Sequence, residues 1–117
     1  MGRLTTHVLD TSLGLPGAGI DVSVFRVDGS ARLLLNSVTT NRNGRCDEPL
    51  LEGAALTPGI YELVFAVGEY FSTRGLTLPN PPFVGDVVLR VGIADDSQHY
   101  HVPLLVSPWS YSTYRGS

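Results

Sequence analysis

The chain has 117 residues, enough for one hydrophobic core without metal or disulfide staples, so we expect a single domain spanning residues 1–117. The formal net charge of −3 argues against a nucleic-acid partner, because no basic stripe is present to meet phosphates. All eight basic residues are arginine, which excludes Schiff-base and lysine general-base chemistry and leaves planar anion recognition by guanidinium open.

The cysteine count and the hydropathy of the chain indicate the cellular compartment of the protein. The single cysteine, Cys46, cannot form an intrachain disulfide, so an oxidising compartment is not required. No apolar run is long enough to cross a membrane, and the first ten residues lack the pattern of a signal peptide. We therefore expect a cytoplasmic protein, and the 43% hydrophobic content favours an oligomer that buries surface beyond the monomer.

Alternation of apolar and polar residues predicts short β-strands along most of the chain. Asp28-Gly29 is a strong hairpin signal. The prolines of residues 78–83 predict a stiff loop, and residues 70–76 are the one stretch where we expect a helical turn or two. The expected strands are residues 4–9, 20–27, 32–39, 60–67 and 86–93, with a short edge segment at residues 45–49 and two strands between residue 99 and the C-terminus.

Seven or eight short strands, separated by turn signals about every 8–12 residues, are typical of an antiparallel β-sandwich. The fold class is therefore all-β, with one short helix. The disulfide that marks antibody-type sandwiches is impossible here because the chain has one cysteine.

Two histidines lie two residues apart near the C-terminus. Side chains alternate along a strand, so His99 and His101 project from one face, while Val102 and Leu104 take the opposite, packed face. This spacing can chelate a metal, with His7 as a third ligand. Because no carboxylate or cysteine ligand lies nearby in the sequence, we expect no metal and no cofactor.

Three further residues have a structural and a functional interpretation. His7, inside the first strand, is by itself more typical of a packed histidine. Arg45 follows an Asn-Gly turn and either pairs with the acids of Asp47-Glu48 or presents its guanidinium to an oxyanion. Cys46 is either a small hydrophobic residue or a thiol activated by its cationic neighbour, and the first is far more common.

Five segments of the chain form a pattern: residues 4–10 (LTTHVLD), 40–45 (TNRNGR), 49–51 (PLL), 99–105 (HYHVPLL) and 114–117 (YRGS). Taken together, these segments resemble the transthyretin-like 5-hydroxyisourate hydrolases, and the similarity spans essentially the whole chain. The C-terminal tetrapeptide is the signature of that family and is highly specific. The proline-rich stretch of residues 78–85 departs from the family pattern but lies outside its motifs.

The resemblance implies a prealbumin-type (transthyretin-like) sandwich and a cofactor-free activity in urate and purine degradation. The reaction is hydrolysis of 5-hydroxyisourate to 2-oxo-4-hydroxy-4-carboxy-5-ureidoimidazoline. It also implies a homotetramer, a dimer of dimers with its sites at the dimer–dimer interface, and no membrane partner. The implied catalytic residues are His7, Arg45 and His101, and the implied substrate-binding residues are His7, Arg45, Tyr114, Arg115 and Ser117.

Histidine, with an ordinary pKa of about 6.5, suits the removal of a proton from water near neutral pH. The sequence leaves open whether His7 or His101 is that base, while Arg45 would offset the charge of the tetrahedral intermediate. Two alternatives to a hydrolase remain: a non-catalytic small-molecule carrier on the same scaffold, and a sandwich module for protein contacts. The vertebrate hormone carrier transthyretin lacks the histidine set and the terminal YRGS, so the hydrolase is favoured.

Overall fold

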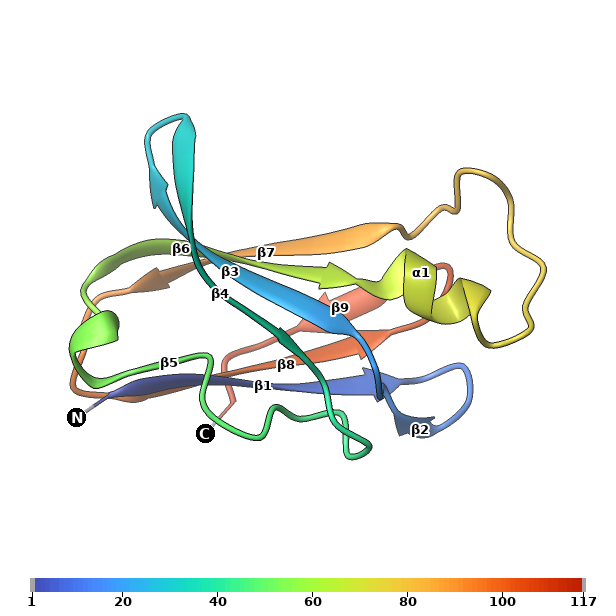
Figure 1. Ribbon diagram of the computed structural model, residues 1–117, viewed down its shortest axis with the longest axis horizontal. Helices are drawn as coiled ribbons and strands as arrows, with labels where there is room; N and C mark the ends of the chain where they lie inside the picture. The colour runs from blue at the N-terminus through green and yellow to red at the C-terminus, as the bar shows by residue number, and fades with distance from the viewer. Residues whose placement is uncertain (1, 117) are drawn as a thin grey trace.

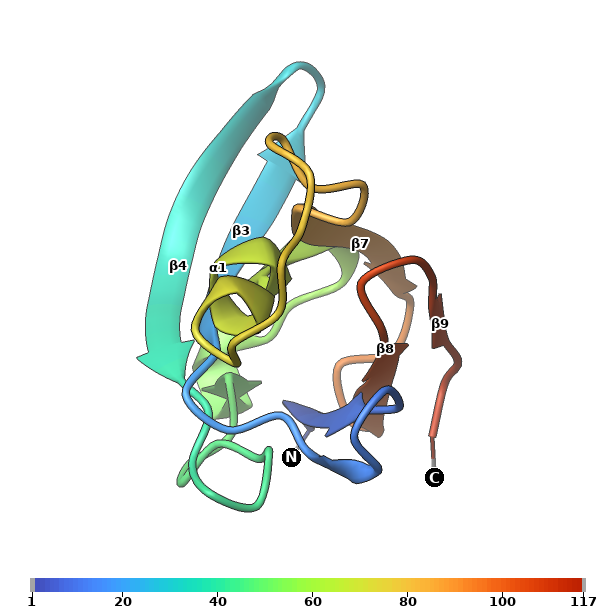
Figure 2. The ribbon, with the colours of Figure 1, turned by 90° about the vertical axis from the view of Figure 1, so that its right-hand side faces the viewer.

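The computed structural model describes residues 2–116, which fold into two β-sheets packed face to face (Figures 1 and 2). The predicted all-β sandwich with one short helix is confirmed. Its elements are β1 (Arg3–Asp10), β2 (Leu15–Pro16), β3 (Asp21–Asp28), β4 (Ala31–Thr39), β5 (Leu51–Glu52), a 3₁₀ turn (Gly53–Ala55), β6 (Gly59–Ala66), α1 (Val67–Ser72), β7 (Asp86–Ile93), β8 (His99–Val106) and β9 (Tyr111–Thr113).

One sheet has the strand order β2-β1-β8-β9, with β5 also paired to β1, and the other has the order β4-β3-β6-β7. All pairs are antiparallel except β1 and β8, the first and last long strands, which run parallel. In this register Thr5 lies opposite His101 and Arg3 opposite His99. The parallel pair therefore places residues almost a hundred positions apart side by side.

The core lies between the sheets because alternate residues of each long strand point inward. In β1 and β8, Leu4, Val8, Val102 and Leu104 are buried, as the period-two pattern requires. Full burial of such a side chain contributes about 1.5–3 kcal/mol to the free energy of unfolding. Thr5, His7, His99 and His101 take the opposite positions, so they face outward.

The short helix α1 closes one end of the sandwich (Figure 1). It begins at Val67, earlier than the expected residue 70, and ends at Ser72 because its buried side chains, Val67, Tyr70 and Phe71, pack on the core over less than two turns. The Tyr70 hydroxyl donates a 2.8 Å hydrogen bond to Asp10 at the end of β1. Burial and the Asp10 carboxylate raise the pKa of Tyr70 to about 12, so the Tyr70 hydroxyl stays protonated at neutral pH and continues to donate this hydrogen bond.

The shortest elements differ from expectation. The two-residue strands β2 and β5 lie in stretches that the sequence predicts to be loops. Two residues are too few to show a hydrophobic period, and both strands form because their partner β1 offers free backbone groups there. None of the helices within residues 2–116 is long and apolar enough to cross a membrane.

Candidate active site

A cluster of histidines lies on the outer face of β1 and β8. The Thr5 hydroxyl stands between two of them, with Oγ1 2.7 Å from Nε2 of His99 and 2.8 Å from Nδ1 of His101. The two imidazole centroids are 6.1 Å apart. The sequence-based prediction that both rings share one face of a strand is thus confirmed, and the parallel partner strand adds a hydroxyl between them.

The turn at residues 41–44 brings Arg45 to β1. The Asn41 side-chain oxygen accepts hydrogen bonds from the backbone N–H groups of Asn43, at 2.9 Å, and Arg45, at 3.2 Å. Gly44 has φ +75°, and a Cβ at this position would collide with the carbonyl of Val8, so the turn requires glycine. The turn leaves Arg45 bridged to β1 directly opposite His7.

The same turn orients His7. Its Nε2 lies 3.0 Å from the carbonyl oxygen of Asn43. A carbonyl only accepts, so Nε2 of His7 carries a proton, and in the neutral ring Nδ1 is left as the acceptor. His7 and Arg45 therefore form a paired unit at the edge of the cluster.

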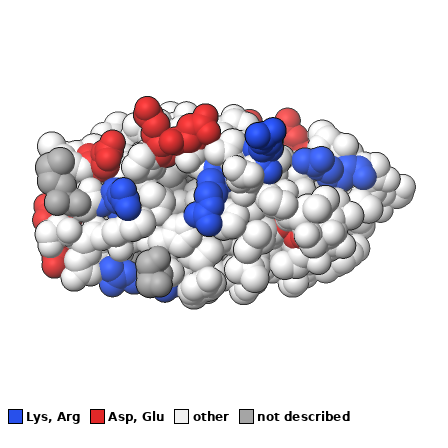
Figure 3. Space-filling model, turned by 90° about the horizontal axis from the view of Figure 1, so that it is seen from below, with Lys and Arg blue, Asp and Glu red and all other residues white. Residues whose placement is uncertain are grey.

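The cluster borders a hollow of about 360 Å³ on the outer face of the sheet. No carboxylate lines it, so its charged groups are cationic and suit oxygen-rich or anionic ligands. The face seen from below carries basic side chains in separate patches and no continuous stripe (Figure 3). The lining residues are Arg3, Thr5, Thr6, Arg45, Cys46, His99 and His101.

The pKa of each of the three histidines is lowered from its ordinary value, which favours the neutral ring. Desolvation and then the Arg45 charge lower the pKa of His7. Desolvation also lowers the pKa of His101, followed by the charges of Arg45, His99 and His7. For His99 desolvation again comes first, and Arg3 and Arg115 lower the pKa further. A neutral imidazole is the form that can accept a proton from water.

The C-terminal tail runs beside β8. The N–H of Gly116 donates a 2.7 Å hydrogen bond to the carbonyl of His101. The guanidinium of Arg115 stacks 4.3 Å from the ring centroid of Tyr100 and donates to Gln98 Oε1 at 2.7 Å. The tail is thereby docked along its described length.

The structure does not bring every predicted site residue to the same hollow. His7, Arg45 and His101 gather on one face, whereas Tyr114 and Arg115 line a separate hollow of about 390 Å³ with Val102 and other residues. Ser117 lies outside the described residues.

Three lining residues, Arg3, Thr5 and Thr6, were missed by sequence reasoning. Arg3 and Thr5 share the outward face of β1 with His7, at positions four and two residues before it. The two-residue alternation of these positions was visible in the sequence. The pairing of β1 with β8, which makes them part of a site, was not.

The alternative interpretations of single residues are now testable on geometry. Salt bridges among residues 2–116 join Glu62 to Arg32 and Arg90, and none involves Arg45, so its guanidinium is not held by the neighbouring acids. Burial and the Asp47 charge raise the pKa of the Cys46 thiol, which opposes the activated-thiol interpretation. Residues 2–116 contain no group of three or more metal-ligating side chains placed to hold an ion.

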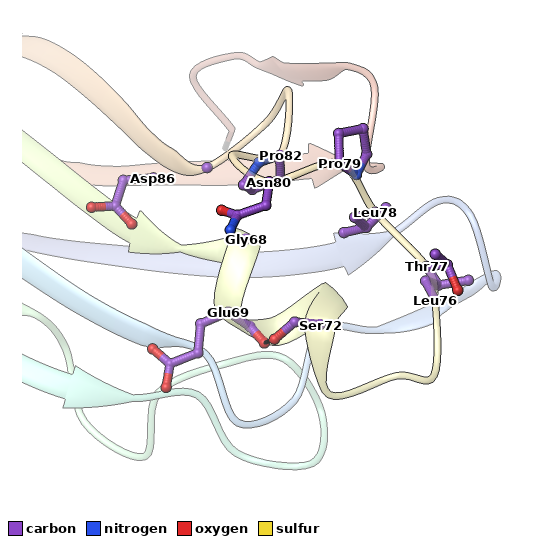
Figure 4. A pocket seen from close by; sticks show the side chains of 11 residues that line it. Gly68, Glu69, Ser72, Leu76, Thr77, Leu78, Pro79, Asn80, Pro82 and Asp86 are labelled. Carbon is purple, nitrogen blue, oxygen red and sulfur yellow. Dashed lines mark hydrogen bonds between the residues drawn. The ribbon is translucent and has the colours of Figure 1, made fainter.

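Another hollow, of about 590 Å³, lies between α1 and the loop that leads to β7 (Figure 4). Its polar lining groups include the carboxylates of Glu69 and Asp86 and the amide of Asn80, and no histidine or arginine takes part. This hollow shares no residue with the histidine cluster. The histidine cluster, by contrast, combines imidazole bases with Arg45, whose guanidinium forms no salt bridge within residues 2–116.

Fold and site together define a transthyretin-type sandwich with a histidine-arginine site. The model of the "HIUase/Transthyretin family" matches residues 4–116, and the chain belongs to that family. It is 59% identical over 117 residues to the "5-hydroxyisourate hydrolase" of Ralstonia nicotianae, covering 100% of both chains.

Solved structures agree on the fold. The chain matches "(S)-allantoin synthase" with a TM-score of 0.93 and 44% identity, over 99% of its own length, but it spans only 44% of that longer chain. It also matches sea bream transthyretin in complex with thyroxine, with a TM-score of 0.87, covering 97% of this chain and 94% of that one. At 22% identity the second likeness shows the fold alone.

Proposed function

We propose that this chain is a hydrolase that opens the activated cyclic amide of 5-hydroxyisourate, giving 2-oxo-4-hydroxy-4-carboxy-5-ureidoimidazoline in urate degradation. One observation carries the proposal. A chain 59% identical over its full length to a named 5-hydroxyisourate hydrolase gathers neutral histidines and an unpaired arginine around one hollow free of carboxylates.

We assign the general base to His101. Its ring lines the hollow, while His7 does not. Nδ1 of His101 is engaged by Thr5, so Nε2 is the nitrogen left to take a proton from the attacking water. The lowered pKa of His101, caused first by desolvation and then by Arg45, keeps the ring neutral and ready to accept it.

Arg45 then holds the oxygens of the substrate and offsets the negative charge of the tetrahedral intermediate. A preorganised donor of this kind is worth roughly 3–4 kcal/mol in other enzymes. His7, fixed by Asn43 and facing Arg45, binds the substrate beside it. Because the substrate is already labile, positioning and one base suffice for ring opening.

The tail completes the proposed site through a neighbouring subunit. Tyr114 is 61% exposed and lies by a different hollow of its own chain, so we assign it to the substrate of an adjacent subunit. Arg115 and the Ser117 carboxylate would lock the tail in place and thereby hold Tyr114. This arrangement requires that the sites form where subunits meet.

We therefore propose a homotetramer, a dimer of dimers. Both sheets end on the same side of the sandwich with a strand that has one free edge, β7 and β9 (Figure 2). Exposed apolar side chains, among them Phe83, Trp109 and Tyr111, remain to be covered. Light scattering coupled to size exclusion would test this, and a monomer would contradict the shared site. We also propose that residues 1–117 act as one domain, because both sheets contribute to a single core. A cytoplasmic location is part of the same proposal.

The test of activity uses 5-hydroxyisourate freshly made from urate by urate oxidase and followed by its ultraviolet absorbance. This compound decays spontaneously, so the expected result is a rate above background that grows in proportion to protein and is lost in His101→Asn. Decay at the background rate would contradict the hydrolase. Saturable binding without consumption would instead support a carrier.

A further inference from the structure

The position of Thr5 raises a question that the proposed reaction does not answer. Its hydroxyl contacts Nε2 of His99 and Nδ1 of His101 at nearly equal distances, 2.7 and 2.8 Å. The contacts are set by backbone pairing, since Thr5 is the register partner of His101 in the parallel pair of β1 and β8. Two imidazoles are thus joined through one oxygen that a strand holds in place.

Proton counting limits how this group can be arranged. A threonine hydroxyl has one proton to donate, so when both rings are neutral it donates to at most one of them. If it donates to His101, the proton of that ring is on Nε2, which cannot then act as a base. If it donates to His99, Nδ1 of His101 carries the proton and donates to Thr5, and Nε2 of His101 has its lone pair free toward the hollow.

We propose that Thr5 is a positioning residue that holds His101 in the second arrangement and links it to His99, which serves as a proton reservoir. This inference rests on the proposed function and gives His99 a role in it. His99 itself is exposed and so exchanges protons with solvent, whereas His101 is half-buried.

The proton transfer balances within the three side chains. Nε2 of His101 takes a proton from water as the water oxygen bonds to the substrate carbonyl carbon. Nδ1 of His101 then gives its proton to Oγ1 of Thr5 as the hydroxyl proton of Thr5 passes to Nε2 of His99. While the tetrahedral intermediate persists, the positive charge lies on His99 and His101 is neutral with its proton on Nε2. As Nε2 of His101 protonates the leaving nitrogen and the C–N bond breaks, the proton on Nε2 of His99 returns through the Thr5 hydroxyl to Nδ1 of His101, so both rings end neutral.

The charges around the cluster set the direction of return. Arg45 faces His101, and Arg3 and Arg115 lie near His99, so a cation on either ring is repelled. No carboxylate lines the hollow to stabilise it. His99 therefore holds the proton only briefly and returns it through Thr5, which resets the site.

The test compares Thr5→Val, which keeps the shape and removes the hydroxyl, with Thr5→Ser, which keeps the hydroxyl. We expect kcat to fall about 10- to 100-fold in Thr5→Val with KM changed less than about 2-fold, and to stay within about 3-fold of wild type in Thr5→Ser. Thr39→Val is the matched control. It removes a hydroxyl that donates to Asp21, and both residues lie on the sheet that does not carry the histidine cluster. Equal losses in the serine and valine variants would overturn the proposal.

A second readout does not depend on activity. Imidazole nitrogen NMR across pH follows the protonation of His99 and His101 in the whole protein. We expect the two titrations to be more strongly coupled in wild type and Thr5→Ser than in Thr5→Val, where only the charge interaction between the rings remains. Equal coupling in wild type and Thr5→Val would overturn the link. If wild type failed to consume 5-hydroxyisourate while its two rings remained coupled through Thr5, the proposed function would fail and the hydrogen-bonded link would stand.

Discussion

Replacement of Gly116 by alanine tests how closely the docked tail controls the base. Gly116 lies beside His101, and a Cβ added to it would stand 2.7 Å from Cδ2 and 3.3 Å from Cγ of the imidazole. Carbon atoms seldom approach within 3.4 Å, so the ring or the tail would have to move by about 0.7 Å.

The consequence follows from the neighbouring hydrogen bond. Because β8 lies between the tail and β1, a ring that moves away from the tail is pushed toward Thr5. The contact between Nδ1 of His101 and Thr5 is already 2.8 Å, so the imidazole must tilt out of its place and the hydrogen-bond geometry is lost. Displacements approaching 1 Å in a catalytic group can cost about 100-fold in rate. We therefore expect Gly116→Ala to lower kcat by about 10- to 100-fold, with about 1–3 kcal/mol lost from the free energy of unfolding.

The assay is the decay of freshly made 5-hydroxyisourate, measured well below the melting temperature of the variant. Gly85→Ala is the matched control, because a Cβ there meets no atom within 4 Å and should leave the rate unchanged. Circular dichroism would confirm that both variants are folded. A Gly116→Ala protein with wild-type kcat would refute the argument that contact between the tail and His101 governs the base.

Further changes probe the rest of the site. His101→Asn and His7→Asn should each lower kcat about 100-fold or more without unfolding the sandwich, and wild-type rates in both would remove the histidines from the mechanism. Deletion of residues 114–117 should abolish activity while the circular dichroism spectrum is kept; retained activity would show that the tail is dispensable. In Arg45→Gln, loss of a charge that lowers the pKa of His101 should raise that pKa toward its ordinary 6.5 in an NMR titration, so protonation on acidification begins at higher pH; an unchanged titration would contradict the charge coupling. Exhaustive chelation should leave the hydrolysis rate unchanged, since side chains supply base and charge, and activity lost and restored by zinc would show otherwise.

Sequence reasoning recovered the site residues that local patterns mark and missed those that long-range strand pairing adds. The alternation of strand side chains predicts that His99 and His101 share a face, and the Asn-Gly turn predicts that Arg45 is held by a rigid backbone. Both predictions are possible because these rules act within a few residues of the chain. Thr5 and Arg3 carry no local mark of function. They belong to the site because β1 pairs with β8 in one particular register, and no short-range pattern specifies that register.

The sequence by itself determined the β-sandwich class, most of the long strands, the choice of histidine as the base and, through family motifs, the expected reaction. Tertiary structure decided how distant segments meet. The parallel pairing of β1 with β8 joins Thr5 to two histidines, and the turn before Arg45 brings the backbone of that residue opposite His7. The physical reason is that side-chain period and turn preference act within a few residues, whereas strand pairing is chosen by burial of the whole core.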